Sequence, residues 1–407
     1  MKQRLVFLAT AMLFFSFTAM SEPPIEDEPT IIDNVYQIAT WQDLLWISQN
    51  PTHWDKDYVQ TNDIDFATAD PAINTWNEGK GWSPIGQFTG SYDGGGYTIK
   101  NLYIDRPSED GIGLFAFVIE ASIENIRLVD ANIKGYEFVG GIVGVSIFSQ
   151  ISNCFVSGNI QGDAGIGGII GIIVGGVINE SHNTANIVGR EVAGGLAGGY
   201  QAGHVVNSYN SGDITGHNFL GGLVGALTGS KSGADEHITN SFSTAAFHLT
   251  GAPETKRTKK RSHPIISGFD FGDLHSKTTP MVGGIVGYDG HGFAITNSFF
   301  DYEVATSLGA VIEMDNLGAI GKTTEEMMNP ETYASWGADI IADENIEKGY
   351  PILAWQYDAS GRKNDPFWII GTGTGNGEPV AVPLSDTALY LGLLLIGGFL
   401  VFRTYRS

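Results

Sequence analysis

Short apolar segments marked by three glycines recur at a fixed interval through the middle of the chain. Each has the pattern apolar-Gly-Gly-apolar-apolar-Gly, and four copies follow one another every 27 residues, beginning at Val139, Ile166, Ala193 and Leu220. A fifth copy begins at Val282. Two further apolar columns keep the same step: Ile133, Ile160, Ile187 and Ile214, and then Ile151, Ile178 and Val205. A period shared by three registers indicates one structural unit repeated along the chain.

The residues between these glycines predict β-strands. They form short runs rich in β-branched side chains, three to five residues long, separated by Gly, Asn, Ser and Asp, with no helical periodicity long enough for a crossover helix. A short strand cannot bury its apolar face alone, so each unit has to pair with the next at a spacing of about 4.8 Å. The pattern therefore predicts an all-β fold, a parallel β-helix (solenoid) with one coil per 27-residue unit.

The paired glycines are expected to be architectural. They permit a tight corner and a close approach of neighbouring coils, which a Cβ atom would obstruct. The residue after each pair points inward, so one interior column is expected to contain Ile142, Ile169, Leu196, Leu223 and Ile285. The paired glycines are Gly140, Gly141, Gly167, Gly168, Gly194, Gly195, Gly221, Gly222, Gly283 and Gly284.

Asparagine marks a second bend in the unit. Asn153, Asn207, Asn240 and Asn297 each begin a triplet that continues with Ser or Cys and an aromatic residue. Stacked asparagines at a bend can hydrogen-bond along their column, which is the role expected here. Cys154 stands where the other triplets have serine, so we interpret it as a small buried residue rather than a nucleophile.

The glycine cassette followed by the Asn-Ser-aromatic triplet resembles the GLUG repeat of secreted bacterial proteins. The segments before and after the repeats, from Asp63 to Phe115 and from Gly321 to Leu353, are similar to those of the family as well. The resemblance implies a right-handed β-helix on an extracellular protein, usually without activity assigned to the repeats. GLUG repeats also accompany immunoglobulin-cleaving metalloproteases, but the zinc-binding pattern His-Glu-x-x-His occurs nowhere in this chain, so protease activity is not carried over.

Repeat stacks need closed ends, and both ends of the array carry candidate caps. A short helix at residues 40–49, with Thr40 as N-cap, is expected to cover the first coil. Bulky residues after Thr324, including Trp336 and Trp355, are expected to close the last coil. The predicted organisation is a signal peptide (1–21), a linker (22–35), an N-terminal cap (36–82), the solenoid (83–300, with an insertion at 252–279), a C-terminal cap (301–357), a flexible linker (358–382) and a membrane anchor or sorting signal (383–407).

The two ends of the chain predict export to the cell surface or outer envelope. Lys2 and Arg4 precede an apolar run, Leu5–Ala19, which is typical of a signal peptide because it is shorter than the roughly 20 residues of a membrane span. The C-terminal segment Thr387–Phe402 is apolar and is followed by two arginines. This layout resembles tripartite sorting signals of bacterial surface proteins, and a plain single-pass anchor is the alternative. The C-terminal segment is therefore a candidate membrane contact, and the body is either anchored or released.

The chain is strongly acidic, with 22 Lys and Arg against 45 Asp and Glu and a formal net charge of −23. A field of this sign repels phosphate backbones, so nucleic acid is not an expected partner. The single cysteine excludes an intrachain disulfide, and the histidines lack metal-ligand spacing. We expect no cofactor. Asp63, Asp65 and Asp93 are calcium candidates, although aspartate is also the ordinary turn residue.

A basic run stands out in this acidic chain. The fourth and fifth glycine segments are 62 residues apart, and the excess contains the run, which we predict to lie on a protruding loop rather than in a degenerate coil. The run could grip an acidic polymer or a lipid headgroup, form a protease-sensitive linker, or be solvated without a ligand. Its candidate ligand-binding residues are Lys256, Arg257, Lys259, Lys260 and Arg261.

Two function classes fit the sequence. The favoured one is a non-catalytic surface scaffold or adhesin that binds an extracellular glycan or protein along its flank. The alternative is a polysaccharide lyase or glycoside hydrolase, since β-helices host such enzymes. Its candidate residues are Asp235, Glu236, Asp270, Asp273 and His275. No paired-carboxylate motif is present, so no catalytic residue is assigned.

Overall fold

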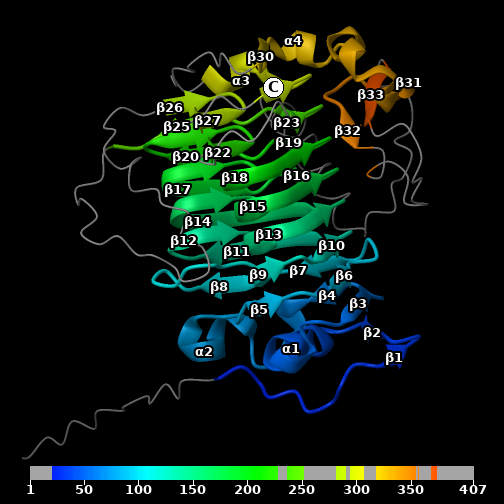
Figure 1. Ribbon diagram of the computed structural model, residues 1–407, viewed down its shortest axis with the longest axis vertical. Coiled ribbons are helices and arrows are strands. Elements are labelled where there is room, and N and C mark those ends of the chain that lie inside the picture. The colour runs from blue at the N-terminus through cyan, green and yellow to red at the C-terminus, as the bar shows by residue number, and fades with distance from the viewer. Residues whose placement is uncertain are drawn as a thin grey trace, which may run out of the picture.

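The computed structural model describes residues 21–227, 236–251, 281–289, 294–306, 318–353, 356 and 368–373. Within these residues the strands form two large sheets of 14 and 16 strands and a small sheet of three. Every pair in the large sheets is parallel except β1 with β2. Figure 1 shows the strands stacked one above another along the long axis. The predicted all-β, parallel class is confirmed, and we call the two large sheets together the stack.

The elements have the following bounds. The first sheet contains β1 (Ile31–Ile32), β2 (Val35–Ile38), β3 (Asp57–Gln60), β5 (Ile85–Phe88), β6 (Ser91–Asp93), β9 (Phe115–Ile119), β10 (Ser122–Glu124), β13 (Val143–Ser152), β15 (Ile170–Asn179), β18 (Ala197–Val206), β22 (Val224–Leu227), β23 (Glu236–Thr239), β27 (Val286–Asp289) and β28 (Ala294–Thr296). The second contains β4 (Ile64–Asp65), β7 (Thr98–Lys100), β8 (Tyr103–Asp105), β11 (Arg127–Lys134), β12 (Glu137–Gly140), β14 (Phe155–Gly167), β16 (His182–Asn183), β17 (Asn186–Gly194), β19 (Tyr209–Asn210), β20 (Ile214–Gly216), β21 (Phe219–Gly221), β24 (Phe242–Ser243), β25 (Phe247–Leu249), β26 (Met281–Gly283), β29 (Phe299–Asp301) and β30 (Ile320–Lys322). The small sheet contains β31 (Ile340–Glu347), β32 (Ile352–Leu353) and β33 (Trp368–Gly373), and the α-helices are α1 (Trp41–Gln49), α2 (Trp76–Gly79), α3 (Tyr302–Thr306) and α4 (Thr324–Met327). Short 3-10 segments span Pro51–His53, Phe66–Thr68, Ile73–Thr75 and Pro330–Asp339.

The strands pair in the register that the repeat predicts. Both apolar columns are confirmed, because successive members are direct partners, as in Ile160 with Ile187 and Ile151 with Ile178. Several strands are longer than the predicted three to five residues, and β14 reaches 13. Irregularities in the pairing with β17, around Gly162 and Ala164, allow the ladder to continue across a bend.

The interior column after the paired glycines is confirmed. Its five side chains are fully buried, and the backbone connects them, since the amide of Ile142 donates to the carbonyl of Ile169 and the amide of Ile169 to that of Leu196. A Cβ on Gly140 would lie 2.2 Å from the carbonyl oxygen of Val143. The glycine is therefore needed for space, and its φ is not positive.

The asparagine bend works differently from the prediction. Asn153, Asn207, Asn240 and Asn297 have φ of 52°, 48°, 47° and 47°, the left-handed conformation that asparagine tolerates. Within the described residues the Oδ1 atoms of Asn153 and Asn207 accept no hydrogen bond. The asparagines therefore form the bend, and the residue after each one contributes to a ladder of hydrogen bonds between units.

That ladder is built from serine hydroxyls. The amide of Ser181 donates to Ser208 Oγ at 3.1 Å, and the amide of Ser208 donates to Ser241 Oγ at 3.1 Å. Cys154 occupies the first place in this column, where its amide donates to Ser181 Oγ. Burial raises the pKa of the Cys154 thiol to about 12, which agrees with its interpretation as an inert packing residue.

In the described residues no further unit lies between the fourth and fifth glycine segments, because Leu220 pairs directly with Val282. Val205 pairs with Ile238, 33 residues later instead of 27, so this unit is already longer before β23, which was not predicted. The additional residues fall within 228–235 and 252–280, and the predicted protruding loop therefore lies outside the described residues.

The predicted N-terminal helix is confirmed as α1, which lies at one end of the stack in Figure 1. Thr40 is its N-cap: the Asp43 amide donates to Thr40 Oγ1 at 3.2 Å, and the Thr40 amide donates to Asp43 Oδ2 at 2.8 Å. Leu44, Leu45 and Ile47 of this helix are fully buried.

The C-terminal segment covers a side of the stack as well as its end. In Figure 1, α3 and α4 lie at the end opposite α1, whereas β31, β32 and β33 lie beside the upper strands. The side they cover is a column of stacked rings with centroids 4.4–4.9 Å apart, which we call the aromatic column: Phe155, His182, Tyr209 and Phe242. Trp368 packs on two of these rings, and the Gln356 amide donates to His182 Nε2 at 3.2 Å and to Tyr209 Oη at 2.9 Å. The segment was predicted to close the last coil, and it also covers this side of the stack.

The predicted signal peptide, apart from its last residue, and the predicted anchor at residues 383–407 lie outside the described residues, as does Trp355. Among the residues that are described, no helix has the length and apolar character needed to cross a membrane.

A charge in the interior column should abolish the fold. We expect Leu223→Asp to leave the chain unfolded, so that no cooperative melting transition is seen, because an unpaired buried carboxylate costs several kcal/mol. Asn186→Asp, at an exposed position on β17, is the matched control and should melt close to the parent protein. Circular dichroism melting compares the two, and equal melting temperatures would contradict the inward placement of Leu223.

His182 should make the stack sensitive to acid. Burial, aided by the charge of Arg127, lowers the pKa of His182 to about 3, below its usual value of about 6.5. The unfolded chain therefore binds a proton below pH 6.5 that the folded chain rejects, and stability falls as the pH drops from 6.5 towards 3. His182→Phe keeps a stacked ring and should remove about 1–3 kcal/mol of the acid loss at pH 4.5, on top of a pH-independent offset for the lost hydrogen bond. Urea unfolding from pH 7.5 to 4.5 measures this, and parallel curves for the two proteins would rule the effect out.

Candidate functional site

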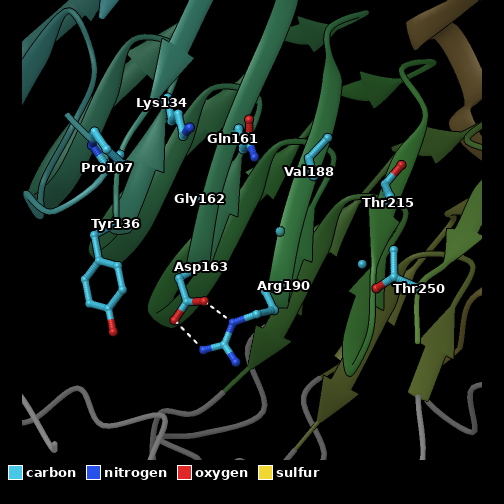
Figure 2. Close-up of a pocket in the computed structure, with 13 residues that line it drawn as sticks. Pro107, Lys134, Tyr136, Gln161, Gly162, Asp163, Val188, Arg190, Thr215 and Thr250 are labelled. Carbon is cyan, nitrogen blue, oxygen red and sulfur yellow. Dashed lines mark hydrogen bonds and ion pairs between the residues drawn. The ribbon is translucent and has the colours of Figure 1, made fainter. Parts of the chain in front are cut away.

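A groove of about 350 Å³ crosses the second sheet where successive units turn. Figure 2 shows its lining side chains in two rows that run across the strands. The lining residues are Pro107, Lys134, Gly135, Tyr136, Gln161, Gly162, Asp163, Val188, Gly189, Arg190, Thr215, Gly216 and Thr250. They come from equivalent positions of successive units, so the groove is itself a product of the repeat.

The first row of the groove consists of Lys134, Gln161, Val188 and Thr215. These residues are direct partners on β11, β14, β17 and β20, and they are therefore spaced by about 4.8 Å. Gln161 is exposed, and Val188 is 37% exposed although it is apolar. The row presents an ammonium group, an amide, an isopropyl group and a hydroxyl in sequence along the stack.

The second row lies two residues further along each unit and contains Tyr136, Asp163 and Arg190. A glycine separates the rows in every unit, as Gly162 does between Gln161 and Asp163. A Cβ on Gly162 would lie 2.4 Å from the buried Ile166 side chain, so this place in the turn has no room for one. The glycines let the chain turn tightly over the core and bring the rows close together.

An ion cluster fixes the middle of the second row. The Arg190 guanidinium donates from Nε and Nη2 to the two carboxylate oxygens of Asp163, the latter at 2.8 Å, as Figure 2 shows. Nη2 also lies 2.9 Å from Glu191 Oε1. The hydrogen bond to Asp163 raises the pKa of Arg190. Both carboxylates are buried, at 9% and 5% exposure, so they depend on the guanidinium for compensation of their charge.

The cluster is poorly suited to acid-base catalysis. Asp163 is the one carboxylate among the described residues that line the groove, and both of its oxygens are held by Arg190. Glycoside hydrolysis by the common mechanisms uses two carboxyl groups that flank the scissile bond. The described residues of the groove offer hydrogen-bonding and apolar groups for binding, but they do not include a second carboxyl group.

One end of the groove lies beside Thr250, the last but one of the described residues before the predicted basic insertion. His217 Nδ1 and the Thr250 carbonyl oxygen are 2.8 Å apart, which fixes the chain just before it leaves the described residues at Gly251. The predicted ligand-binding residues Lys256, Arg257, Lys259, Lys260 and Arg261 lie outside the described residues.

The candidate residues for hydrolysis are not assembled into a site by the described structure. Asp235, Asp270, Asp273 and His275 lie outside the described residues. Glu236 begins β23 in the first sheet, whereas the groove lies on the second.

The three calcium candidates accept hydrogen bonds from neighbouring parts of the stack. Asp63 Oδ1 accepts from the amide and hydroxyl of Thr98, at 2.8 and 2.9 Å. Asp65 and Asp93 each accept from one backbone amide and one asparagine side chain. No group of three or more His, Cys, Asp or Glu side chains in the described part of the chain is arranged to hold a metal. Calcium binding stays an untested prediction.

Sequence reasoning missed the groove, although a signal for it exists. Gly135, Gly162, Gly189 and Gly216 recur every 27 residues, two positions after the isoleucine column that begins at Ile133. A glycine column between two outward-facing positions marks a tight turn with close side-chain rows. The groove lies at this turn.

Comparison with known proteins bears on the repeat and the fold. A model described as the GLUG motif matches residues 135–161, one unit that begins and ends in the groove. A stretch of 120 residues, 28% of this chain, is 38% identical to halomucin of Haloquadratum walsbyi and spans 1% of that protein's length. The crystal structure of a protein proposed to be an immunoglobulin A1 protease from Bacteroides ovatus superposes with a TM-score of 0.51 at 19% identity, covering 81% of this chain and 95% of that one. At this identity the likeness is one of fold.

Arg190 should be required for stability at neutral pH. Arg190→Met leaves Asp163 and Glu191 buried without their cation, and we expect it to lower the free energy of unfolding by about 1–3 kcal/mol at pH 7.5. Lys134→Met, which removes a cation from the same groove, should change stability by less than about 0.5 kcal/mol. Urea unfolding at pH 7.5 checks this, and a loss for Arg190→Met no larger than that for Lys134→Met would show that the cluster does not govern stability.

Proposed function

We propose that this chain, a member of the GLUG-repeat family, is a non-catalytic β-solenoid of the cell surface that binds an extended glycan or protein along its flank. The observation that carries the proposal is the groove, in which the walls repeat in register and the lining carboxylate is held by Arg190. Such a surface can make the same contact several times along a regular polymer, and it lacks a free pair of acids for turnover.

The solenoid itself is part of the proposal. Each unit pairs in parallel with the next in both sheets, at an offset of 27 residues through most of the repeats. The tight turn at Ile142 and its equivalents leads the chain from one sheet to the other within each unit, as from β12 to β13. We propose that these units are coils of a right-handed β-helix, closed at its ends by α1 and by the segment that contains α4.

The proposed location is the cell surface or the medium around it. The GLUG motif and the similarity to halomucin support a secreted or surface-associated protein. We further propose that residues 1–21 direct export and that residues 383–407 hold the body at the membrane or are removed on sorting. An acidic body with a net charge of −23 suits such surroundings, because its charge keeps it soluble in salt.

A glycan-array screen with the full-length protein tests the proposed function. We expect binding to one glycan class and no release of new reducing ends from any bound glycan. Release of reducing ends would contradict the proposal and identify a polysaccharide-degrading enzyme. A variant that lacks residues 252–279 serves as the comparison, and retained binding would place the ligand on the stack rather than on the insertion.

A further inference from the structure

We infer that the groove binds a neutral, linear polysaccharide that lies along the stack, with one sugar residue opposite each unit. The inference rests on the proposed function and specifies its ligand and the direction in which the ligand lies. It uses the stack alone and does not involve the basic insertion.

The spacing of the lining residues sets the direction. The first row places one side chain per unit, about 4.8 Å from the next, parallel to the long axis of the stack. A pyranose in an extended chain is about as long as this strand spacing. Successive sugars can therefore meet Lys134, Gln161, Val188 and Thr215 in turn without losing register.

The chemistry of the rows suits a sugar. The Gln161 amide and the Thr215 hydroxyl can each donate and accept hydrogen bonds, as sugar hydroxyls require. Val188 offers an exposed apolar contact for the C–H face of a ring. Tyr136 stands in the second row and projects away from the sheet in Figure 2, which places an aromatic ring beside the groove.

The charges favour a neutral ligand. Arg190 is held by Asp163 and Glu191, so its guanidinium is not available to pair with a ligand carboxylate. Lys134 is the one lining cation without an ion pair to the described residues. An anionic polymer would gain a single ammonium contact while it approached a body with a net charge of −23, whereas a neutral polymer avoids this repulsion.

The backbone of the groove favours a glycan over a peptide. A peptide that adds to a sheet needs unpaired backbone groups on that sheet. Here they are used between units: the Gly135 amide donates to the Gln161 carbonyl at 3.0 Å, and the Asp163 amide donates to the Tyr136 carbonyl at 2.7 Å. Recognition in the groove therefore falls to side chains, and side chains of this kind match hydroxyl groups.

The test uses the full-length protein and labelled oligosaccharides in a fluorescence-polarisation titration. The neutral probes are cello-oligosaccharides, manno-oligosaccharides and laminari-oligosaccharides of increasing length, and the anionic probes are oligogalacturonates. We expect a neutral series to bind with little dependence on salt. Its affinity should rise with length until the chain reaches all four side chains of the first row, and then level off.

Variants in the groove locate the binding. Gln161→Ala and Val188→Asp should each weaken the neutral series by about tenfold, which corresponds to about 1.4 kcal/mol. Asn159→Ala is the matched control, since Asn159 lies exposed on the same strand as Gln161 but outside the groove, and its affinity should match that of the parent protein.

Three outcomes would overturn the inference. Preferential binding of oligogalacturonates that weakens with salt would identify an anionic ligand, and unchanged affinity in both groove variants would place the ligand elsewhere. Absence of binding to every oligosaccharide, together with a positive glycan array, would exclude this ligand class. In each of these cases the proposed surface-binding function survives, whereas release of reducing ends from a bound glycan would remove that function and the inference together.

Discussion

Parallel backbone pairing between each unit and the next is the constraint on which the rest of the structure depends. Because a residue lies beside its equivalent 27 positions later, each choice of side chain is repeated as a column along the stack. Inward columns form a continuous apolar core, as Ile142, Ile169 and Leu196 do. Buried polar columns need hydrogen-bond partners within the stack. The buried serines have them, because each serine hydroxyl accepts a hydrogen bond from a backbone amide of the unit before. The groove is an outward column that is made in the same way.

The same constraint explains how much the sequence could predict. A column whose members share one chemistry is visible as a period, so the core, the paired glycines and the serine position of Cys154 could be placed before the structure was known. The role of the asparagines could not, because Asn153 and Ser181 both favour bends, and only the backbone shows which side chain faces the neighbouring amide. The groove escaped notice because its first row mixes lysine, glutamine, valine and threonine and has no period of its own, so that only the glycine column beside it marks the turn.

The contacts of the C-terminal segment do not follow the 27-residue repeat. Gln356 contacts rings from two units that precede it by 174 and 147 residues, and contacts of that length leave no local pattern in the sequence. The segment packs over the aromatic column, whereas the groove lies at a different turn of the units, beside Thr250. The stack thus has one flank that is covered by its own chain and one that presents polar and apolar side chains outward. That division is why the groove, rather than the aromatic column, is our candidate binding surface.

Removal of one unit tests the central claim, which is that register between equivalent positions holds the molecule together. Deletion of residues 170–196 joins Ile169 to Ala197, and Ala197 is the pairing partner of the deleted Ile170, so every column is preserved. Deletion of residues 170–195 removes one residue fewer and shifts every later side chain to the opposite face. Circular dichroism melting should show a cooperative transition for the first variant, at a temperature lowered by the loss of Arg190 beside Asp163, and none for the second. Equal behaviour of the two variants would contradict the account.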